Sequence, residues 1–377
     1  NRRFTPYAGF PGKPIRFLES LLINKAGDFS EDNTAGIDRR EIIQHFCEET
    51  GMPTFMVDPD ILMEIHKVKA NFNNNVFGQE GAVDSVVDVL AAVKAALTRT
   101  GKPIASFLFV GPTGVGKTEL AKVLAEFMFG SRERMVRFDM SEYSDPYSVL
   151  RLIESGRGGS GLLTSAVRQE PFCVLLFDEI EKADGTFYDF LLQILGEGRL
   201  TDSRGRLVNF CSTIIIMTSN IGAGNLTGNR ISWDNKVDAQ EVTNHFMGAV
   251  ERHFRPELFN RIDKVIPFEP LSPETVRYVV ERELLLLQKR EGIQFRSMDL
   301  QIEDEVLDYL AQAGYDVAYG ARQLQRTIRE ELVIPLAHDL NQEDSEDQLQ
   351  VHVQKGESGL NIEVSADQLG LDLLLEK

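Results

Sequence analysis

The chain has 377 residues, 42% of them hydrophobic, and a formal net charge of −18 at pH 7. This length allows two or three globular domains with real cores. Nucleic acids and anionic membranes bind clustered Lys and Arg, so the acidic balance argues against both as broad partners. No apolar run approaches the roughly 20 residues of a membrane span. The three cysteines are too few and scattered for a disulfide framework, and two of them interrupt apolar runs as buried thiols do. We therefore expect a reducing compartment, the cytoplasm.

The first 60 residues predict two amphipathic helices, over residues 10–22 and 38–50, joined by a polar stretch. They cannot form a complete core of their own. The chain also begins with Asn1 rather than Met. We therefore expect residues 1–60 to be the end of a larger structure that precedes the next domain.

Five short apolar runs predict buried strands, at residues 106–110, 134–138, 173–177, 213–217 and 264–268. Helical patterns lie between them. The apolar residues between Thr118 and Met128 recur at helical spacing, and Gly130 follows as a stop signal. Apolar strands that alternate with amphipathic helices are typical of a parallel sheet covered on both faces. Residues 61–270 are therefore expected to form one α/β domain.

The pattern changes after Pro270. Ser272 and Pro273 begin a long predicted helix over residues 274–292, and two more helical segments follow to about residue 341. Residues 347–364 alternate polar and apolar side chains around a glycine-containing turn, which predicts a hairpin. Residues 271–377 are therefore expected to form a smaller, mostly helical domain.

The segment "GPTGVGKT" matches the P-loop pattern G-x-x-x-x-G-K-[ST], between a predicted strand and a predicted helix. In such a loop, backbone amides cradle phosphate, Lys117 reaches the terminal phosphates and the Thr118 hydroxyl binds Mg²⁺. A chance glycine turn is the alternative, which the strand and helix disfavour. The expected contacts to ATP are Gly111, Pro112, Thr113, Gly114, Val115, Gly116, Lys117, Thr118 and Glu119.

Two acids follow the buried strand at 173–177. Asp178 can hold Mg²⁺ through its water shell, and Glu179 can orient or deprotonate the attacking water. The same pair could instead stabilise the positive N-terminus of the next helix. The carboxyl end of a parallel strand is where such sheets bind ligands, and the P-loop predicts a nucleotide there. The catalytic interpretation is therefore favoured.

The motifs "VFGQEGAV", "GPTGVGKTELAK", "FDMSEYSD", "LLFDEIEKAD", "GEGRLTDSRGRLVNF", "FRPELFNRID" and "GYDVAYGARQLQR" occur in this order. Together they resemble the second AAA+ ATPase module of the Clp family of ring-forming unfoldases and disaggregases, from about Val76 to Glu363. The resemblance implies a P-loop AAA+ fold, in which helices flank a five-stranded parallel sheet and a smaller helical domain with a C-terminal hairpin follows. Residues 1–60 are similar to the end of a preceding module and its linker.

The resemblance also implies roles for single residues. Val76 and Phe77 would line the adenine pocket, Asn220 would help to position the attacking water, and Arg322 would reach the nucleotide from the small domain. Read from local sequence alone, Asn220 could be a cap at a strand end and Arg322 a salt-bridge partner between domains.

Arg261 would be the arginine finger that acts on the ATP of a neighbouring subunit. Alternatively, it lies four residues after Glu257 and could form an ordinary helix ion pair. A finger requires an oligomer, and a head-to-tail contact that closes on itself forms a ring. The family suggests six subunits.

The resemblance places a substrate-gripping pore loop at residues 152–168, "LIESGRGGSGLLTSAVR". This stretch is shorter than the family's loop and has no tyrosine. Either the protein lacks the aromatic grip here, or residues of an exposed loop tip are missing between Arg157 and Gly158. The behaviour of exposed glycine loops favours the second interpretation.

The implied function is ATP-dependent unfolding or remodelling of polypeptides that a ring pulls through its pore. The alternative is a nucleotide-gated ring scaffold or regulatory ATPase that threads nothing. A nucleic-acid motor would need a basic pore, which the acidic composition disfavours. Clp ATPases that feed a peptidase carry an Ile-Gly-Phe or Ile-Gly-Leu tripeptide, whereas this chain has only Ile231, Ser232 and Trp233 in that region. The resemblance therefore gives no support to a peptidase partner.

Overall fold

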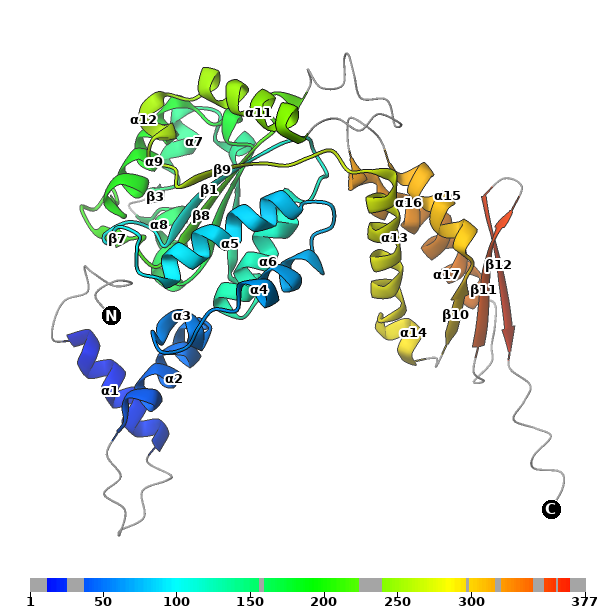
Figure 1. The fold of residues 1–377 in the computed structure, drawn as a ribbon, viewed down its shortest axis with the longest axis horizontal. Coiled ribbons are helices and arrows are strands. Elements are labelled where there is room, and N and C mark those ends of the chain that lie inside the picture. The colour runs from blue at the N-terminus through cyan, green and yellow to red at the C-terminus, as the bar shows by residue number, and fades with distance from the viewer. Residues whose placement is uncertain are drawn as a thin grey trace, which may run out of the picture. The chain divides into compact units, whose positions relative to one another are not determined.

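The computed structural model describes residues 12–25, 37–155, 159–223, 239–295, 298–315, 320–341, 349–356 and 359–366 (Figure 1). The chain divides into two compact units. The first comprises residues 1–111, 116–222 and 239–268, and the second comprises residues 112–115, 223–238 and 269–377. Among the described residues, no helix combines the length and apolarity needed to cross a bilayer.

The first unit is built on a five-stranded sheet whose neighbouring strands are all parallel. In spatial order these are β2 (Met135–Asp139), β5 (Val174–Asp178), β8 (Ile214–Ser219), β1 (Ala105–Val110) and β9 (Lys264–Pro267). Every residue of β1, β5 and β8 is buried, as the continuous apolar runs predicted. All five predicted strands are confirmed.

Helices lie on both sides of this sheet, as Figure 1 shows. They are α4 (Ile65–Asn73), α5 (Glu80–Lys94), α6 (Lys117–Phe129), α7 (Pro146–Leu150), α8 (Leu162–Gln169), α9 (Gly185–Glu197), α11 (Ala239–His253) and α12 (Pro256–Phe259). The helix predicted after the P-loop is α6, and Gly130 ends it in the left-handed conformation. Two predicted buried thiols, Cys173 and Cys211, lie in this core. Burial raises their pKa values to about 12 and about 11.

The N-terminal helices α1 (Gly12–Lys25) and α2 (Arg39–Thr50) are present as predicted, and a short helix α3 (Thr54–Val57) follows. Helix α2 ends at Gly51, whose φ is 73°. A Cβ atom at Gly51 would lie 2.0 Å from the carbonyl oxygen of Phe129, the last residue of α6. The guanidinium of Arg134 donates to the carbonyl oxygen of Thr50 at 3.0 Å. This segment therefore packs on the end of α6 that is opposite the P-loop.

The second unit contains α13 (Pro273–Gln288), α14 (Glu291–Phe295), β10 (Asp299–Ile302), α15 (Asp304–Gly314), α16 (Leu324–Ile328), α17 (Ile334–Leu340), β11 (Leu349–Gly356) and β12 (Gly359–Ala366). The predicted C-terminal hairpin is the antiparallel pair β11 and β12. Strand β10 was not predicted, and it pairs in parallel with β11. It has four residues, and Leu300 is the only one that is fully buried, so its sequence carries almost no pattern.

The close contact at Gly51 gives a test of how the N-terminal segment packs. Gly51→Ala should lower the free energy of unfolding by more than about 1 kcal/mol, because alanine is strained at positive φ and its methyl group meets a backbone carbonyl. The control is Gly81→Ala on α5, where an added Cβ meets nothing within 4 Å. It should be neutral or stabilise by up to about 1 kcal/mol. Thermal and urea unfolding of both variants measure the difference. Equal stability of the two variants would contradict the packing described here.

Candidate nucleotide-binding and catalytic site

The P-loop joins the buried strand β1 to helix α6. Gly111 and Gly116 both have positive φ, 158° and 106°. A Cβ at Gly111 would lie 2.7 Å from the carbonyl oxygen of Phe268, so only glycine fits there. A Cβ at Gly116 would lie 3.6 Å from Cγ1 of Val76. Val76, an expected adenine contact, is therefore buried beside the loop, and Phe77, the other one, is half-buried.

Lys117 is the first residue of α6, and only 8% of it is exposed. Its ammonium donates to the carbonyl oxygen of Gly111 at 2.5 Å and to Oδ1 of Asn220 at 2.7 Å. The charge is therefore held inside the loop, at the positive end of a helix. This is the combination that binds phosphate.

Asn220 joins this lysine to the second predicted acid. Its Nδ2 donates to Oε1 of Glu179 at 3.2 Å, while its Oδ1 accepts from Lys117. Asn220 follows β8 and Glu179 follows β5, and these strands are neighbours in the sheet. Three residues that are far apart in the sequence thus lie in one chain of hydrogen bonds.

Glu179 has a φ of 56°, which is unusual for a residue other than glycine. Such strain costs on the order of 1–3 kcal/mol and is found at functional sites. The backbone N–H of Glu179 donates to Oγ1 of Thr218 at 3.0 Å, and Lys182 forms an ion pair with its Oε2. The hydrogen bond to Glu179 raises the pKa of Lys182. Neither Thr218 nor Lys182 was predicted to take part.

Asp178 lies one residue earlier, at the end of β5, and is buried. Its Oδ1 accepts from Oγ1 of Thr218, and its Oδ2 accepts from Nη2 of Arg137 at 2.5 Å. Arg137 lies on the neighbouring strand β2, where Asp139 is in register with Asp178. Sequence reasoning missed this arginine, because strand order is needed to place it beside the acid.

A nucleotide-bound Mg²⁺ takes one or two protein oxygens and keeps several waters. The buried carboxylate of Asp178 and the half-buried hydroxyl of Thr118 suit this role. The described part of the chain holds no cluster of three or more His, Cys, Asp or Glu side chains that could bind a metal, and this mode of binding needs none.

Glu119, the last expected contact, makes an ion pair with Arg132 at 2.8 Å. Arg132 also contacts Glu126 at 2.7 Å and the side-chain oxygen of Asn75 at 3.2 Å. The contact seen in the structure therefore links the first turn of α6 to the segment before Val76. A contact between Glu119 and nucleotide stays a prediction.

Arg261 is exposed and follows helix α12. Its Nη1 donates to the carbonyl oxygen of Leu192 on α9, and it lies directly against Gly196. Between the described side chains of Arg261 and Glu257 there is no ion pair, so the local alternative gains no support. Arg322 is exposed in the second unit, in the 3₁₀ turn Ala321–Gln323, and its role stays a prediction.

Comparisons with known proteins match both units. A family model described as the AAA domain of the Cdc48 subfamily matches residues 102–265, and one described as the C-terminal, D2-small domain of ClpB protein matches residues 271–353. The chain belongs to the Clp family of AAA+ ATPases. Membership of this family implies a nucleotide-binding site.

The chain is 40% identical over 362 residues to the chaperone protein ClpB of Meiothermus ruber, a match that covers 93% of this chain and 42% of that protein. It is 40% identical over 325 residues to the chloroplastic ClpB3 of Arabidopsis thaliana, covering 85% and 33%. A closed-state cryo-EM reconstruction of Hsp104 with ATPγS and FITC-casein matches 96% of this chain and 62% of that chain, with a TM-score of 0.79 and 30% identity. The chain thus spans less than half the length of these two ClpB proteins.

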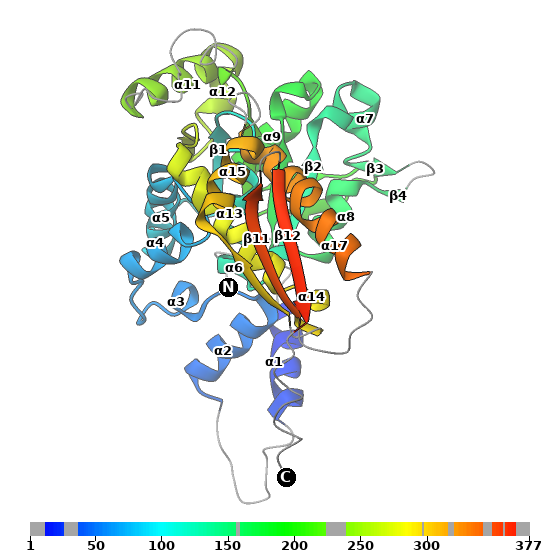
Figure 2. The same cartoon turned by 90° about the vertical axis from the view of Figure 1, so that its right-hand side faces the viewer.

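The glycine-rich run at residues 152–168 departs from the Clp pattern, and its described residues include two short paired strands. Strand β3 (Glu154–Ser155) pairs with β4 (Gly159–Ser160) between α7 and α8 (Figure 2). A Cβ at Gly161 would lie 2.3 Å from the carbonyl oxygen of Leu152, so the chain crosses itself where only glycine fits. That residues are missing between Arg157 and Gly158 stays a prediction, because residues 156–158 are not among those the structure describes. Arg157 lies outside the described residues, as do Ile231, Ser232 and Trp233.

A second hairpin, β6 (Arg199–Thr201) with β7 (Leu207–Asn209), is tied to the first. The backbone N–H of Ser203 donates to the carbonyl oxygen of Ile153 at 3.4 Å. Asp202 is buried between the strands and accepts hydrogen bonds from Arg206 at 2.9 Å and from Arg168 of α8 at 2.9 Å. Burial alone would raise the pKa of Asp202, but the hydrogen bonds from the backbone of Arg206 and from both guanidiniums hold it well below its usual range.

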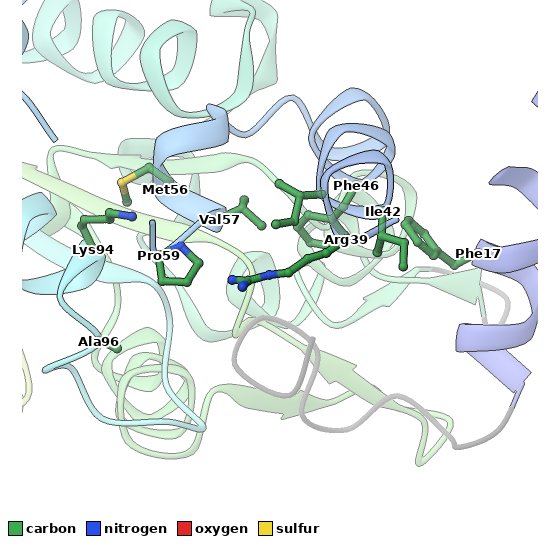
Figure 3. Close-up of a pocket in the computed structure, with 10 residues that line it drawn as sticks. Phe17, Arg39, Ile42, Phe46, Met56, Val57, Pro59, Lys94 and Ala96 are labelled. Carbon is green, nitrogen blue, oxygen red and sulfur yellow. The ribbon is translucent and has the colours of Figure 1, made fainter. Parts of the chain in front are cut away.

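The described residues also enclose a groove of about 460 Å³ near the N-terminal helices (Figure 3). It is lined by Phe17, Arg39, Ile42, Ile43, Phe46, Met56, Val57, Pro59, Lys94 and Ala96. The two cationic side chains of the lining, Arg39 and Lys94, each contact another residue. Arg39 pairs with Asp60 at 3.3 Å, and Lys94 donates to the carbonyl oxygen of Asp58. None of the predicted nucleotide contacts lies in this groove.

The Asp202 cluster should hold the second hairpin closed throughout the neutral pH range. Because its folded pKa is lowered, the contribution of Asp202 is present above the usual value of about 4 and is lost only as the pH falls below it. Asp202→Asn should therefore open the hairpin at pH 8 and speed tryptic cleavage after Arg204. Asp189→Asn, at an exposed acid of α9, is the matched control. Unchanged cleavage of Asp202→Asn would show that the hairpin does not depend on this carboxylate.

Proposed function

We propose that the chain binds Mg-ATP at residues 111–118 and hydrolyses it with Glu179 as the base that activates water. The observation that carries this proposal is the hydrogen-bonded series from Lys117 through Asn220 to Glu179. It joins a phosphate-binding cation to a carboxylate through a carboxamide that can also orient water. A carboxylate and a carboxamide arranged in this way could orient water for in-line attack on a terminal phosphoryl group.

The contacts to the adenine and to Mg²⁺ are assigned from the motifs and the Clp family pattern. Val76 and Phe77 would hold the adenine, and Thr118 and Asp178 would hold Mg²⁺. The ion would neutralise charge on the β- and γ-phosphates. The P-loop amides and Lys117 would fix the phosphates, so that Glu179 takes a proton from a water held by Asn220.

Hydrolysis would be completed by a second copy of the chain. Arg261 is exposed and is not paired with Glu257 in the described structure, so its guanidinium suits the role of a finger for a neighbour's ATP. Fixed positive charge at the γ-phosphoryl oxygens stabilises the transition state. We propose a closed ring of six copies, in which Arg322 contacts the nucleotide from the second unit.

The ring would remodel polypeptides by pulling them through its pore, with both hairpins facing the substrate. The similar proteins are named chaperones, and the Hsp104 reconstruction contains casein. One observation favours a second candidate, a ring scaffold or regulatory ATPase that threads nothing. Strands β3 and β4 have two residues each, and residues 152–168 contain no aromatic side chain with which to grip a substrate.

We further propose a reducing compartment, the cytoplasm, as the location. All three cysteines are free thiols in the structure, and two of them are buried in the core. Because the chain is strongly acidic, we do not propose a nucleic acid as its substrate. We also propose no peptidase partner.

Glu179→Gln tests the assignment of the base. The variant should bind ATP with unchanged affinity, because the P-loop is intact, and should hydrolyse it about 10²- to 10⁴-fold more slowly. Fluorescent-nucleotide titration and phosphate release measure the two quantities. Glu142→Gln, at an exposed acid of the same unit, is the control and should behave as wild type.

Wild-type turnover in Glu179→Gln would reject Glu179 as the base. The same preparation of wild-type protein separates the two candidate functions. Hydrolysis accompanied by unfolding of a tagged model protein supports threading. Hydrolysis without unfolding supports the scaffold.

A further inference from the structure

A third acid, Glu181, lies in the turn that follows the catalytic pair. Its Oε1 accepts a hydrogen bond from the backbone N–H of Asn220 at 3.0 Å. Its Oε2 is buried and has no hydrogen-bond partner in the described structure. The carboxylate thus reaches from the end of β5 across to the end of β8 and holds the main chain there.

The turn that carries Glu181 is itself rigid. It is the 3₁₀ segment Ile180–Lys182, in which the N–H of Lys182 donates to the carbonyl oxygen of Glu179 at 2.9 Å. The hydroxyl of Tyr188 on α9 donates to the carbonyl oxygen of Ile180 at 2.9 Å. Burial and the negative charge of Glu181 raise the pKa of Tyr188 to about 12. These two hydrogen bonds hold the backbone of the turn, and with it the Glu181 side chain, in place.

Glu181 holds the backbone of Asn220, whose side chain connects the two other groups of the site. The Asn220 side chain bonds Lys117 at 2.7 Å and Glu179 at 3.2 Å, so the direction of its Cα–Cβ bond sets both contacts. The residue before it is also tied down, since the carbonyl oxygen of Ser219 accepts from Gly111 at 3.2 Å. Glu181 adds a hydrogen bond at the next position, to the backbone N–H of Asn220.

We propose that Glu181 is a positioning residue for hydrolysis that acts through Asn220 and touches neither nucleotide nor water. This inference rests on the proposed function. Charge-assisted hydrogen bonds to backbone N–H groups are about twice as strong as neutral ones, which suits a contact that must hold one backbone position. Loss of the carboxylate leaves the Asn220 N–H without its acceptor and frees the carboxamide to turn away from Glu179.

The kinetic test uses Glu181→Ala, Glu181→Gln, Asn220→Ala and the double variant Glu181→Ala/Asn220→Ala in the full chain. Glu181→Ala should lower kcat about 5- to 100-fold, the range for a part-buried donor left without its acceptor, and leave the affinity for ATP unchanged. Glu181→Gln keeps an oxygen for the Asn220 N–H and should recover most of the loss. The double variant should be no slower than Asn220→Ala, because Glu181 acts only through that residue.

Wild-type kcat in Glu181→Ala would overturn the inference, and so would losses that multiply in the double variant. Both results leave the proposed function standing if Glu179→Gln is inactive. A wild-type chain that binds ATP without hydrolysing it would reject the proposed function instead. Hydrogen exchange tests whether Glu181 holds the Asn220 backbone, and it needs no enzymatic activity. Amide exchange at residues 219–221 should be faster in Glu181→Ala than in Glu181→Gln. Equal rates would overturn the role of Glu181.

Discussion

The site depends on the order of three parallel strands. Because β5, β8 and β1 are neighbours, their carboxyl ends bring the acids, Asn220 and the P-loop to one edge of the sheet. The carboxamide of Asn220 then spans the gap between Lys117 and Glu179. A change in strand order would leave each motif intact in sequence and would separate the groups that must act together. These three strands are fully buried and almost uniformly apolar, which suits the middle of a sheet that is covered on both faces.

Each acid of the site has a cation from the same chain. Arg137 contacts Asp178, and Lys182 contacts Glu179. These pairs reduce the repulsion between two adjacent carboxylates and hold both side chains near their working positions. Both cations are about half exposed, so solvent reaches these ion pairs at the edge of the site.

Much of this arrangement could be predicted from sequence, for a physical reason. Continuous apolar runs identify buried strands, and a P-loop pattern after one of them predicts a phosphate site, so Lys117, Asp178 and Glu179 could be assigned to one candidate site from sequence. Arg137, Lys182 and Glu181 were not, because their partners are chosen by strand order and turn geometry rather than by spacing. The short strands β3, β4 and β10 escaped notice since two to four residues carry too little pattern. The close approach of Gly161 to the backbone of Leu152 likewise cannot be seen in the sequence.

In the proposed site, one chain supplies most of the groups that hydrolyse ATP, and Arg261 of a second copy completes it. Mixing Arg261→Ala chains with Lys117→Ala chains tests this directly, while native mass spectrometry confirms that mixed oligomers form. Each variant alone should be nearly inactive, because removal of an arginine finger costs about 10³-fold or more in turnover. The mixture should regain hydrolysis wherever an intact P-loop meets an intact Arg261 across an interface. Mixed oligomers that show no recovery would contradict a site completed between two chains.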